Sequence, residues 1–147
     1  MEIRLEEEMP LDEVTARMNA ALPDGFCVLE TFEAVHKVRD LQLAGYRLEI
    51  ALPADTVTAL LAQPEILVEK RTKKKTLKTI DIRPAFENAV VTATKTGCLV
   101  EVQLPVSSEN TGNPTLLITA LTAVVGESPS FAVTRTGLYL ADGKDFK

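Results

Sequence analysis

ILVEKRTKKKTLKTIDIRP, residues 66–84, is the stretch with the clearest pattern in this chain. Four β-branched residues fall on alternate positions near its two ends, namely Ile66, Val68, Ile80 and Ile82. Such alternation is typical of a half-buried pair of strands. Because facing residues of an antiparallel pair share one side of the sheet, Val68 should pair with Ile80 and Ile66 with Ile82. The stretch therefore predicts a β-hairpin whose loop spans residues 72–76, a common loop length.

The same register concentrates positive charge on the hairpin. Seven of the chain's 16 lysines and arginines lie in this stretch, together with two acids. Lys70 is set opposite Lys78, and like charges that face each other across a strand pair cost roughly 0.2–1 kcal/mol. The tip either is fully solvated and blocks edge-to-edge pairing, or it binds an anion. In the second interpretation the binding residues are Lys70, Arg71, Lys73, Lys74, Lys75, Lys78 and Arg83.

Length and composition indicate an ordinary globular protein. The chain has 147 residues, of which 46% are hydrophobic and 25% charged, and its net charge is −5. The basic hairpin therefore belongs to an acidic protein. This length suits one domain with a real core, and no linker divides the sequence, so we predict a single domain over residues 1–147.

Two features bear on the compartment. No apolar run approaches the ~20 residues that cross a membrane, and residues 2–8 are mostly acidic, unlike a secretion signal. We therefore expect a cytoplasmic protein without membrane contact. Cys27 and Cys98 each lie in an apolar, strand-like context, so both are predicted to be buried free thiols.

The order of elements predicts an α+β fold. Strands are expected over residues 2–8, 26–35, 46–52 and 66–72, with helices over 11–22 and 53–61. This is the βαββαβ order of a ferredoxin-like unit. Further antiparallel strands are expected near 88–94, 99–104 and 131–140, and a third helix begins after Asn113 and ends at Gly126. The apolar positions predict a core of Met18, Leu22, Val28, Leu48, Ile50, Leu60, Val68, Ile80, Leu99, Val102, Leu117 and Leu121.

Motifs that carry catalytic or metal chemistry are absent from the sequence. It contains no HExxH, CxxC, GxxxxGK[ST] or GxSxG pattern. His36 is interpreted as a surface or capping residue, and the acidic run Glu6–Glu8 as solvent-facing. Glu69 and Asp81 are interpreted as members of a structural ion-pair set beside Arg71 and Arg83. We therefore predict no catalytic residue, no metal and no cofactor.

Aromatic residues make up 5% of the chain, and the hairpin has none. A platform on which nucleic-acid bases stack is therefore not expected there. Attraction to backbone phosphates is the mode of nucleic-acid binding that the hairpin residues allow.

Three segments together resemble a family of uncharacterised bacterial proteins linked to radical SAM proteins. They are Asn19-Ala-Ala-Leu-Pro-Asp-Gly25 with Val28-Leu-Glu30, Val68-Glu-Lys-Arg-Thr-Lys73 with Asp81-Ile-Arg-Pro84, and Arg135-Thr-Gly-Leu-Tyr139. The likeness covers nearly the whole chain, and the second segment is the most distinctive. It implies a radical SAM protein as partner, encoded beside the family member or fused to it. It also implies gene neighbours that serve RNA processing and the ribosome.

The chain departs from that family in one respect. Members have a further N-terminal segment with a Ser-His-Leu-Asp-like helix and a Gly-Phe-Asn-Pro-like loop, so the resemblance implies that this chain is the C-terminal part of a longer protein. The family has no settled activity, and no catalytic residue is carried over. Two cysteines 71 positions apart cannot supply the three-cysteine motif of a radical SAM enzyme, so radical chemistry belongs to the partner.

Charge and resemblance together give three hypotheses. The first is a non-catalytic accessory module of a radical SAM system that binds RNA, and not DNA, through the hairpin Lys70–Arg83. The alternative is a protein–protein adaptor whose hairpin docks on an acidic face of the radical SAM partner. A weaker alternative is part of an RNA-modifying enzyme whose active site needs the missing N-terminal segment.

Overall fold

The computed structural model describes residues 3–71, 77–106 and 112–146, without the side chains of Lys70 and Arg71. Its internal contacts divide the chain into two compact units, residues 1–38 and residues 39–146. The expectation of one domain over the whole chain stays a prediction.

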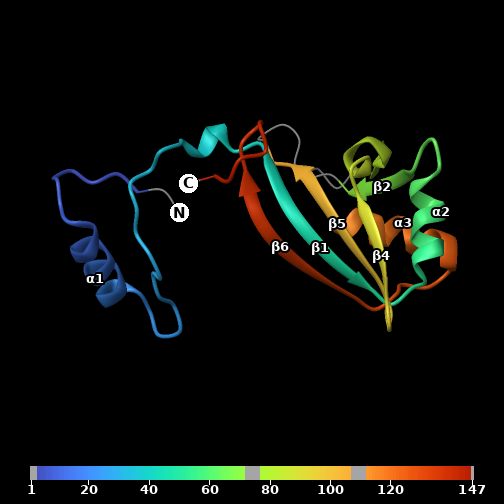
Figure 1. Ribbon diagram of the computed structural model, residues 1–147, viewed down its shortest axis with the longest axis horizontal. Helices are drawn as coiled ribbons and strands as arrows, with labels where there is room; N and C mark the ends of the chain where they lie inside the picture. Colours follow the sequence, from blue (N-terminus) through green and yellow to red (C-terminus); the bar gives the residue numbers. More distant parts are fainter. Residues whose placement is uncertain (1–2, 72–76, 107–111, 147) are drawn as a thin grey trace. The chain divides into compact units, whose positions relative to one another are not determined.

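The larger unit, residues 39–146, is built on a four-stranded antiparallel sheet with the order β4-β5-β1-β6 (Figure 1). Two helices and a separate two-stranded hairpin complete it. The elements in chain order are η1 Val38–Asp40, β1 Leu43–Ile50, α2 Ala54–Leu61, β2 Leu67–Arg71, β3 Leu77–Asp81, η2 Arg83–Phe86, β4 Val90–Thr94, β5 Gly97–Pro105, α3 Thr115–Val125 and β6 Phe131–Tyr139. The α+β class and the antiparallel sheet are thus confirmed.

The ferredoxin-like order is present, but it lies elsewhere in the chain than predicted. The elements β1, α2, β4, β5, α3 and β6 follow one another as βαββαβ, and β5 lies between β1 and β4 as in a split βαβ unit. The hairpin β2–β3 is inserted between α2 and β4. The unit therefore spans residues 43–139, and the prediction that residues 2–72 form it was wrong.

The smaller unit shows why that prediction failed. Helix α1, Leu11–Ala21, is confirmed, but the described residues 3–8 and 26–35 form no strand. Phe26 is 70% exposed and Phe32 56%, so the apolar side chains of this alternating segment stay largely uncovered. The Val28 N–H donates to Asn19 Oδ1 (2.6 Å) and the Asn19 Nδ2–H donates to the Val28 carbonyl (3.1 Å). These local bonds occupy the backbone groups that a ladder would use.

The C-terminus of α3 matches its sequence signal, whereas the helix begins at Thr115, one residue later than predicted. The Asn113 side chain accepts a hydrogen bond from the Thr115 N–H (3.0 Å), and Gly126 ends the helix with φ of 90°. Only a residue without Cβ adopts that conformation at little cost. Helix α2 begins after Pro53, as predicted.

The core of the larger unit lies between one face of the sheet and the two helices. Leu48, Val100 and Leu104 of the sheet are fully buried with Val57 of α2 and Leu117 of α3. Of the predicted core, seven residues are buried, namely Leu48, Ile50, Leu60, Val68, Val102, Leu117 and Leu121. The other five are half-buried: Met18, Leu22, Val28, Ile80 and Leu99. Cys98 is a buried free thiol as predicted, whereas Cys27 is exposed, which corrects the expectation for that residue.

Candidate functional site

The hairpin forms with the predicted register. Strand β2 pairs antiparallel with β3, and Val68 lies opposite Ile80 and Lys70 opposite Lys78. The Ile82 N–H donates to the Ile66 carbonyl (2.9 Å), which extends the pairing by one step toward the core. Residues 72–76, the predicted loop, lie outside the described residues.

The base of the hairpin is fixed in the core. Ile66, Val68 and Ile82 are each 5% exposed or less, and α3 packs against β2. Asp81 Oδ1 accepts hydrogen bonds from the backbone N–H groups of Ile66 (2.8 Å) and Arg83 (3.0 Å). Asp81 therefore closes the base by accepting hydrogen bonds from two amides. The predicted ion-pair set stays a prediction, because the side chain of Arg71 lies outside the described residues.

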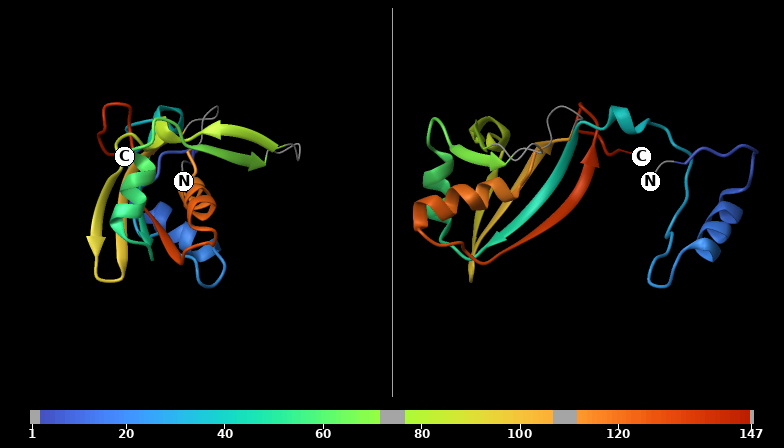
Figure 2. Two further views of the ribbon diagram at one scale, coloured as in Figure 1. Left: turned by 90° about the vertical axis from the view of Figure 1, so that its right-hand side faces the viewer. Right: turned by 180° about the vertical axis from the view of Figure 1, so that it is seen from behind.

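From this base the hairpin extends away from the sheet and helices of its unit (Figure 2). The apolar pairs end at Val68–Ile80, and the Glu69–Thr79 pair separates them from the Lys70–Lys78 pair further out. Lys78 is exposed and has no acidic partner in the part of the chain that the structure describes. The register therefore sets two lysine positions opposite each other, beyond the last apolar pair.

The predicted binding residues fall into three groups. Lys70, Arg71 and Lys78 lie on the two strands, whereas Lys73, Lys74 and Lys75 lie outside the described residues. Arg83 is half-buried in η2, next to the base, and is thus separated from the Lys70–Lys78 pair by the length of the hairpin. The register pairs Lys70 with Lys78 and sets Arg71 opposite Leu77, whereas Arg83 lies at the base.

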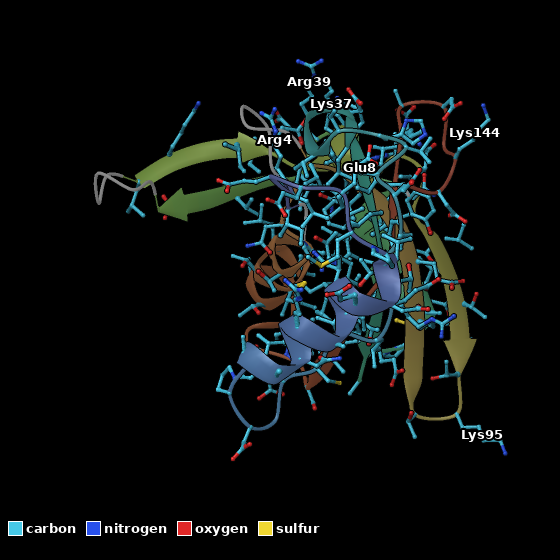
Figure 3. The ribbon with its side chains drawn as sticks, turned by 90° about the vertical axis from the view of Figure 1, so that its left-hand side faces the viewer. Arg4, Glu8, Lys37, Arg39, Lys95 and Lys144 are labelled. Atoms are coloured by element: carbon cyan, nitrogen blue, oxygen red, sulfur yellow. The ribbon has the colours of Figure 1, made fainter. Side chains whose placement is uncertain are left out.

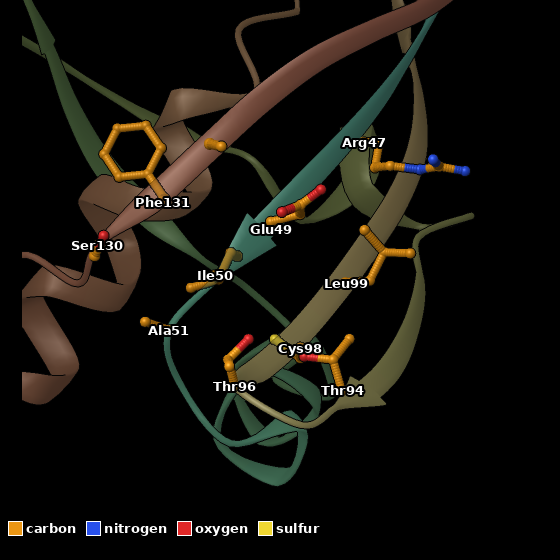
Figure 4. A pocket seen from close by; sticks show the side chains of 11 residues that line it. Arg47, Glu49, Ile50, Ala51, Thr94, Thr96, Cys98, Leu99, Ser130 and Phe131 are labelled. Atoms are coloured by element: carbon orange, nitrogen blue, oxygen red, sulfur yellow. The ribbon is translucent and has the colours of Figure 1, made fainter.

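The open face of the four-stranded sheet is a second surface, which the sequence reasoning missed. Arg47 of β1 lies opposite Glu101 of β5, and their side chains form a salt bridge of 3.1 Å. An open hollow of about 510 Å³ adjoins this pair where β1 ends (Figure 4). Its polar lining comes from Arg47, Glu49, Thr94, Thr96 and Ser130. The alternation of charged and apolar residues in β1 and β5 was the available signal.

That face does not favour nucleic acid. Its carboxylates, Glu49 and Glu101, outnumber Arg47, which is already paired. Tyr139 lies over two glycines: a Cβ on Gly45 would meet its ring at 3.0 Å, and one on Gly137 would meet its hydroxyl at 2.5 Å. This aromatic ring therefore fills the space above the glycines, which leaves it poorly placed to stack on a base.

The described residues lack the features of a membrane span and of a metal site. No helix there has both the length and the apolar composition of a membrane span. Within the same ranges no three His, Cys, Asp or Glu side chains converge as metal ligands would. Burial raises the pKa of the Cys98 thiol above its usual value, which disfavours its reactive thiolate.

Comparison with known proteins gives one match. No curated protein and no solved structure shows significant similarity to the chain. The profile of one family, described as "Uncharacterized protein conserved in bacteria (DUF2344)", matches residues 1–114. The match includes the hairpin and stops just before α3. This chain belongs to that family of bacterial proteins.

Proposed function

We propose that this chain is a non-catalytic accessory module of a radical SAM system that binds RNA through the hairpin β2–β3. The observation that carries the proposal is the Lys70–Lys78 pair beyond the buried base. Two like charges held opposite each other are unfavourable, and a phosphate between them removes that repulsion. The radical SAM partner and the choice of RNA rest on the resemblance described above.

The distribution of charge supports this use of the hairpin. Residues 66–84 hold seven cations and two acids, so the rest of the chain holds nine cations and nineteen acids. An anionic polymer is thus attracted to one projection and repelled by the remainder, which orients it before contact. On the open sheet face, Arg47 is already paired with Glu101, and the ring of Tyr139 packs over Gly45 and Gly137. The hairpin is therefore the surface that suits phosphates.

The alternative function is docking on an acidic face of the radical SAM partner. One observation favours it: Leu67 and Leu77 of the hairpin are 55% and 66% exposed. Exposed leucines gain little from a phosphate backbone, whereas a protein surface could bury them. Both functions use the same cations, so the partner has to be identified directly.

A pull-down separates the two. The wild-type chain and the variant Lys73→Ala/Lys74→Ala/Lys75→Ala are used to capture RNA and proteins from bacterial lysate, and both fractions are identified. We expect the variant to lose RNA and to retain captured protein. The control is Lys95→Ala, because Lys95 extends from the β4–β5 turn of the same unit (Figure 3). Loss of a radical SAM protein with RNA retained would establish the adaptor, and loss of neither would show that the tip is a solubility device.

A further inference from the structure

The outer edge of β6 is an unpaired strand edge with defined limits (Figure 1). Of the two outer strands, β4 has five residues and β6 has nine. The C-terminal residues cover one end of β6, because Tyr139 bridges to Asp145 and the Phe146 N–H donates to the Leu138 carbonyl (2.9 Å). Within the described residues, no strand pairs with this edge over Phe131–Arg135.

The register shows which backbone groups point outward along this edge. The Ala51 N–H donates to the Ser130 carbonyl (2.9 Å), so Ser130 directs its backbone groups toward β1. Hydrogen-bonded and non-bonded pairs alternate along an antiparallel ladder. Ala132 and Thr134 therefore also bond to β1, and the N–H and C=O groups of Phe131, Val133 and Arg135 point to the free side.

We propose that β6 pairs with β6 of a second copy of this chain, antiparallel about a two-fold axis at Val133. In this register Val133 faces the partner's Val133, and Phe131 faces the partner's Arg135. All three outward residues of each strand then exchange backbone hydrogen bonds, whereas a shift by two residues would leave one of them unpaired on each side. The result is a continuous eight-stranded sheet, and this inference is independent of the proposed RNA binding.

The side chains along the free edge of β6 suit pairing with a second β6. Phe131 and Val133 lie opposite the buried Ile50 and Leu48, so they are on the helix-covered face, yet they are 43% and 36% exposed. Arg135 would lie beside the partner's Phe131, where a guanidinium is attracted to an aromatic ring. No like charges would meet, because the residue on the axis is apolar.

Two further observations favour a partner at this place. Residues 131–135 contain no lysine and no proline, the residues that commonly protect exposed edges. Of the seven large hydrophobic residues that are exposed in the described part of unit 39–146, four lie between positions 124 and 133: Val124, Val125, Phe131 and Val133. Contiguous exposed hydrophobic residues mark interaction surfaces, and these four lie close together in the sequence, at the end of α3 and the start of β6. Because the seam is short, we expect a weak, concentration-dependent dimer of the class that buries less than about 1,200 Å².

Sedimentation equilibrium of the 147-residue chain tests the proposal. We expect the mass to rise from 16.0 kDa toward twice that value as the concentration approaches about 1 mM. Val133→Lys and Val133→Glu should each be monomeric, because residue 133 would face its own charge across the axis. An equimolar mixture of the two should dimerise again. The matched control is Thr134→Lys, which adds the same charge to the other face of β6 and should leave the dimer intact.

Three results would overturn the proposal. The wild type could remain monomeric throughout, or Val133→Lys could dimerise as the wild type does. The two charged variants could also fail to associate when mixed, which would exclude the two-fold register. Thermal unfolding by circular dichroism, with melting temperatures close to wild type, shows that each variant is folded.

Discussion

Residues 3–38 and residues 39–146 carry similar hydrophobic patterns, but they differ in how much of the pattern they bury. The larger unit buries alternate residues of β1 and β5 against two helices. In the smaller unit, Val14 is the one buried hydrophobic residue among those described. Eight of its large hydrophobic residues are exposed: Ile3, Leu5, Leu11, Phe26, Leu29, Phe32, Val35 and Val38.

Alternation of apolar and polar residues therefore specifies a strand only where a partner strand is available. The segment 43–50 and the segment 26–35 both alternate, yet β1 has a neighbour on each side whereas 26–35 has none in the structure. An isolated strand gains too little to offset the conformational entropy it loses. Periodicity thus records which residues could share a face, and tertiary contacts decide whether they do.

The two cysteines give the largest expected contrast between the units. Cys98 is 2% exposed and burial raises the pKa of its thiol, whereas Cys27 is exposed. A raised pKa lowers the thiolate fraction at any pH below it, and labelling of Cys98 also requires opening of the core. If opening costs about 5 kcal/mol, Cys98 should react at least about 1,000-fold more slowly than Cys27. Mass spectrometry after timed alkylation measures both rates. Comparable rates would contradict the burial of Cys98 and the exposure of Cys27.

Truncation of a core side chain should affect the larger unit strongly. Leu117 is fully buried, so Leu117→Ala should lower the free energy of unfolding by about 2–5 kcal/mol. Met18→Ala in α1 should change the free energy of unfolding by no more than about 1 kcal/mol, because Met18 is half-buried. The chain has no tryptophan, and both tyrosines, Tyr46 and Tyr139, lie in the larger unit. Urea unfolding followed by tyrosine fluorescence therefore reports that unit, and equal midpoints for the two variants would contradict the assignment of the core.

Two polar side chains that bind backbone groups sharpen the comparison. Asp81→Ala removes the acceptor for the N–H of the buried Ile66, so it should cost about 1–3 kcal/mol in the same urea experiment. Asn19→Ala removes the two bonds to Val28 and should leave the tyrosine-monitored midpoint unchanged. Its effect should be faster hydrogen exchange of the Val28 amide. A loss of stability in the larger unit on Asn19→Ala would show that the two units are coupled.

The smallest expected effect on stability is at the hairpin tip. Surface substitutions away from caps and cores usually change stability by about ±0.5 kcal/mol or less. Lys73→Ala/Lys74→Ala/Lys75→Ala should therefore unfold at the wild-type urea midpoint within that range. A gain of more than about 1 kcal/mol would show that repulsion among the hairpin cations is stronger than the register implies.

Prediction from sequence succeeded where the determinants are local. The hairpin register followed from Val68 and Ile80 with a short loop, and α3 followed from Asn113 and Gly126. The strand order did not, because it depends on contacts such as Arg47 with Glu101, 54 residues apart. The exposure of Cys27 was missed for the same reason: its apolar neighbours indicated burial, but Phe26 and Leu29 are themselves exposed.

The candidate site was predicted in composition but only partly in geometry. The register that pairs Lys70 with Lys78 was available from alternation, since both ends of the stretch had to keep their apolar residues on one side. Arg83 was grouped with the tip because it is close in sequence, although it follows the base of the hairpin in η2. The open sheet face was missed because it is assembled from four strands whose order was not predicted.

The measurement that tests the central claim most directly is the salt dependence of RNA affinity. Phosphate contacts release counterions, so the logarithm of the binding constant should fall linearly with the logarithm of the salt concentration. We expect a steep slope for the wild type and for Lys95→Ala. In the triple lysine variant we expect weaker binding and a slope that is flatter by about one unit per lost contact. A triple variant that keeps the wild-type affinity and slope would contradict the claim that the hairpin binds RNA.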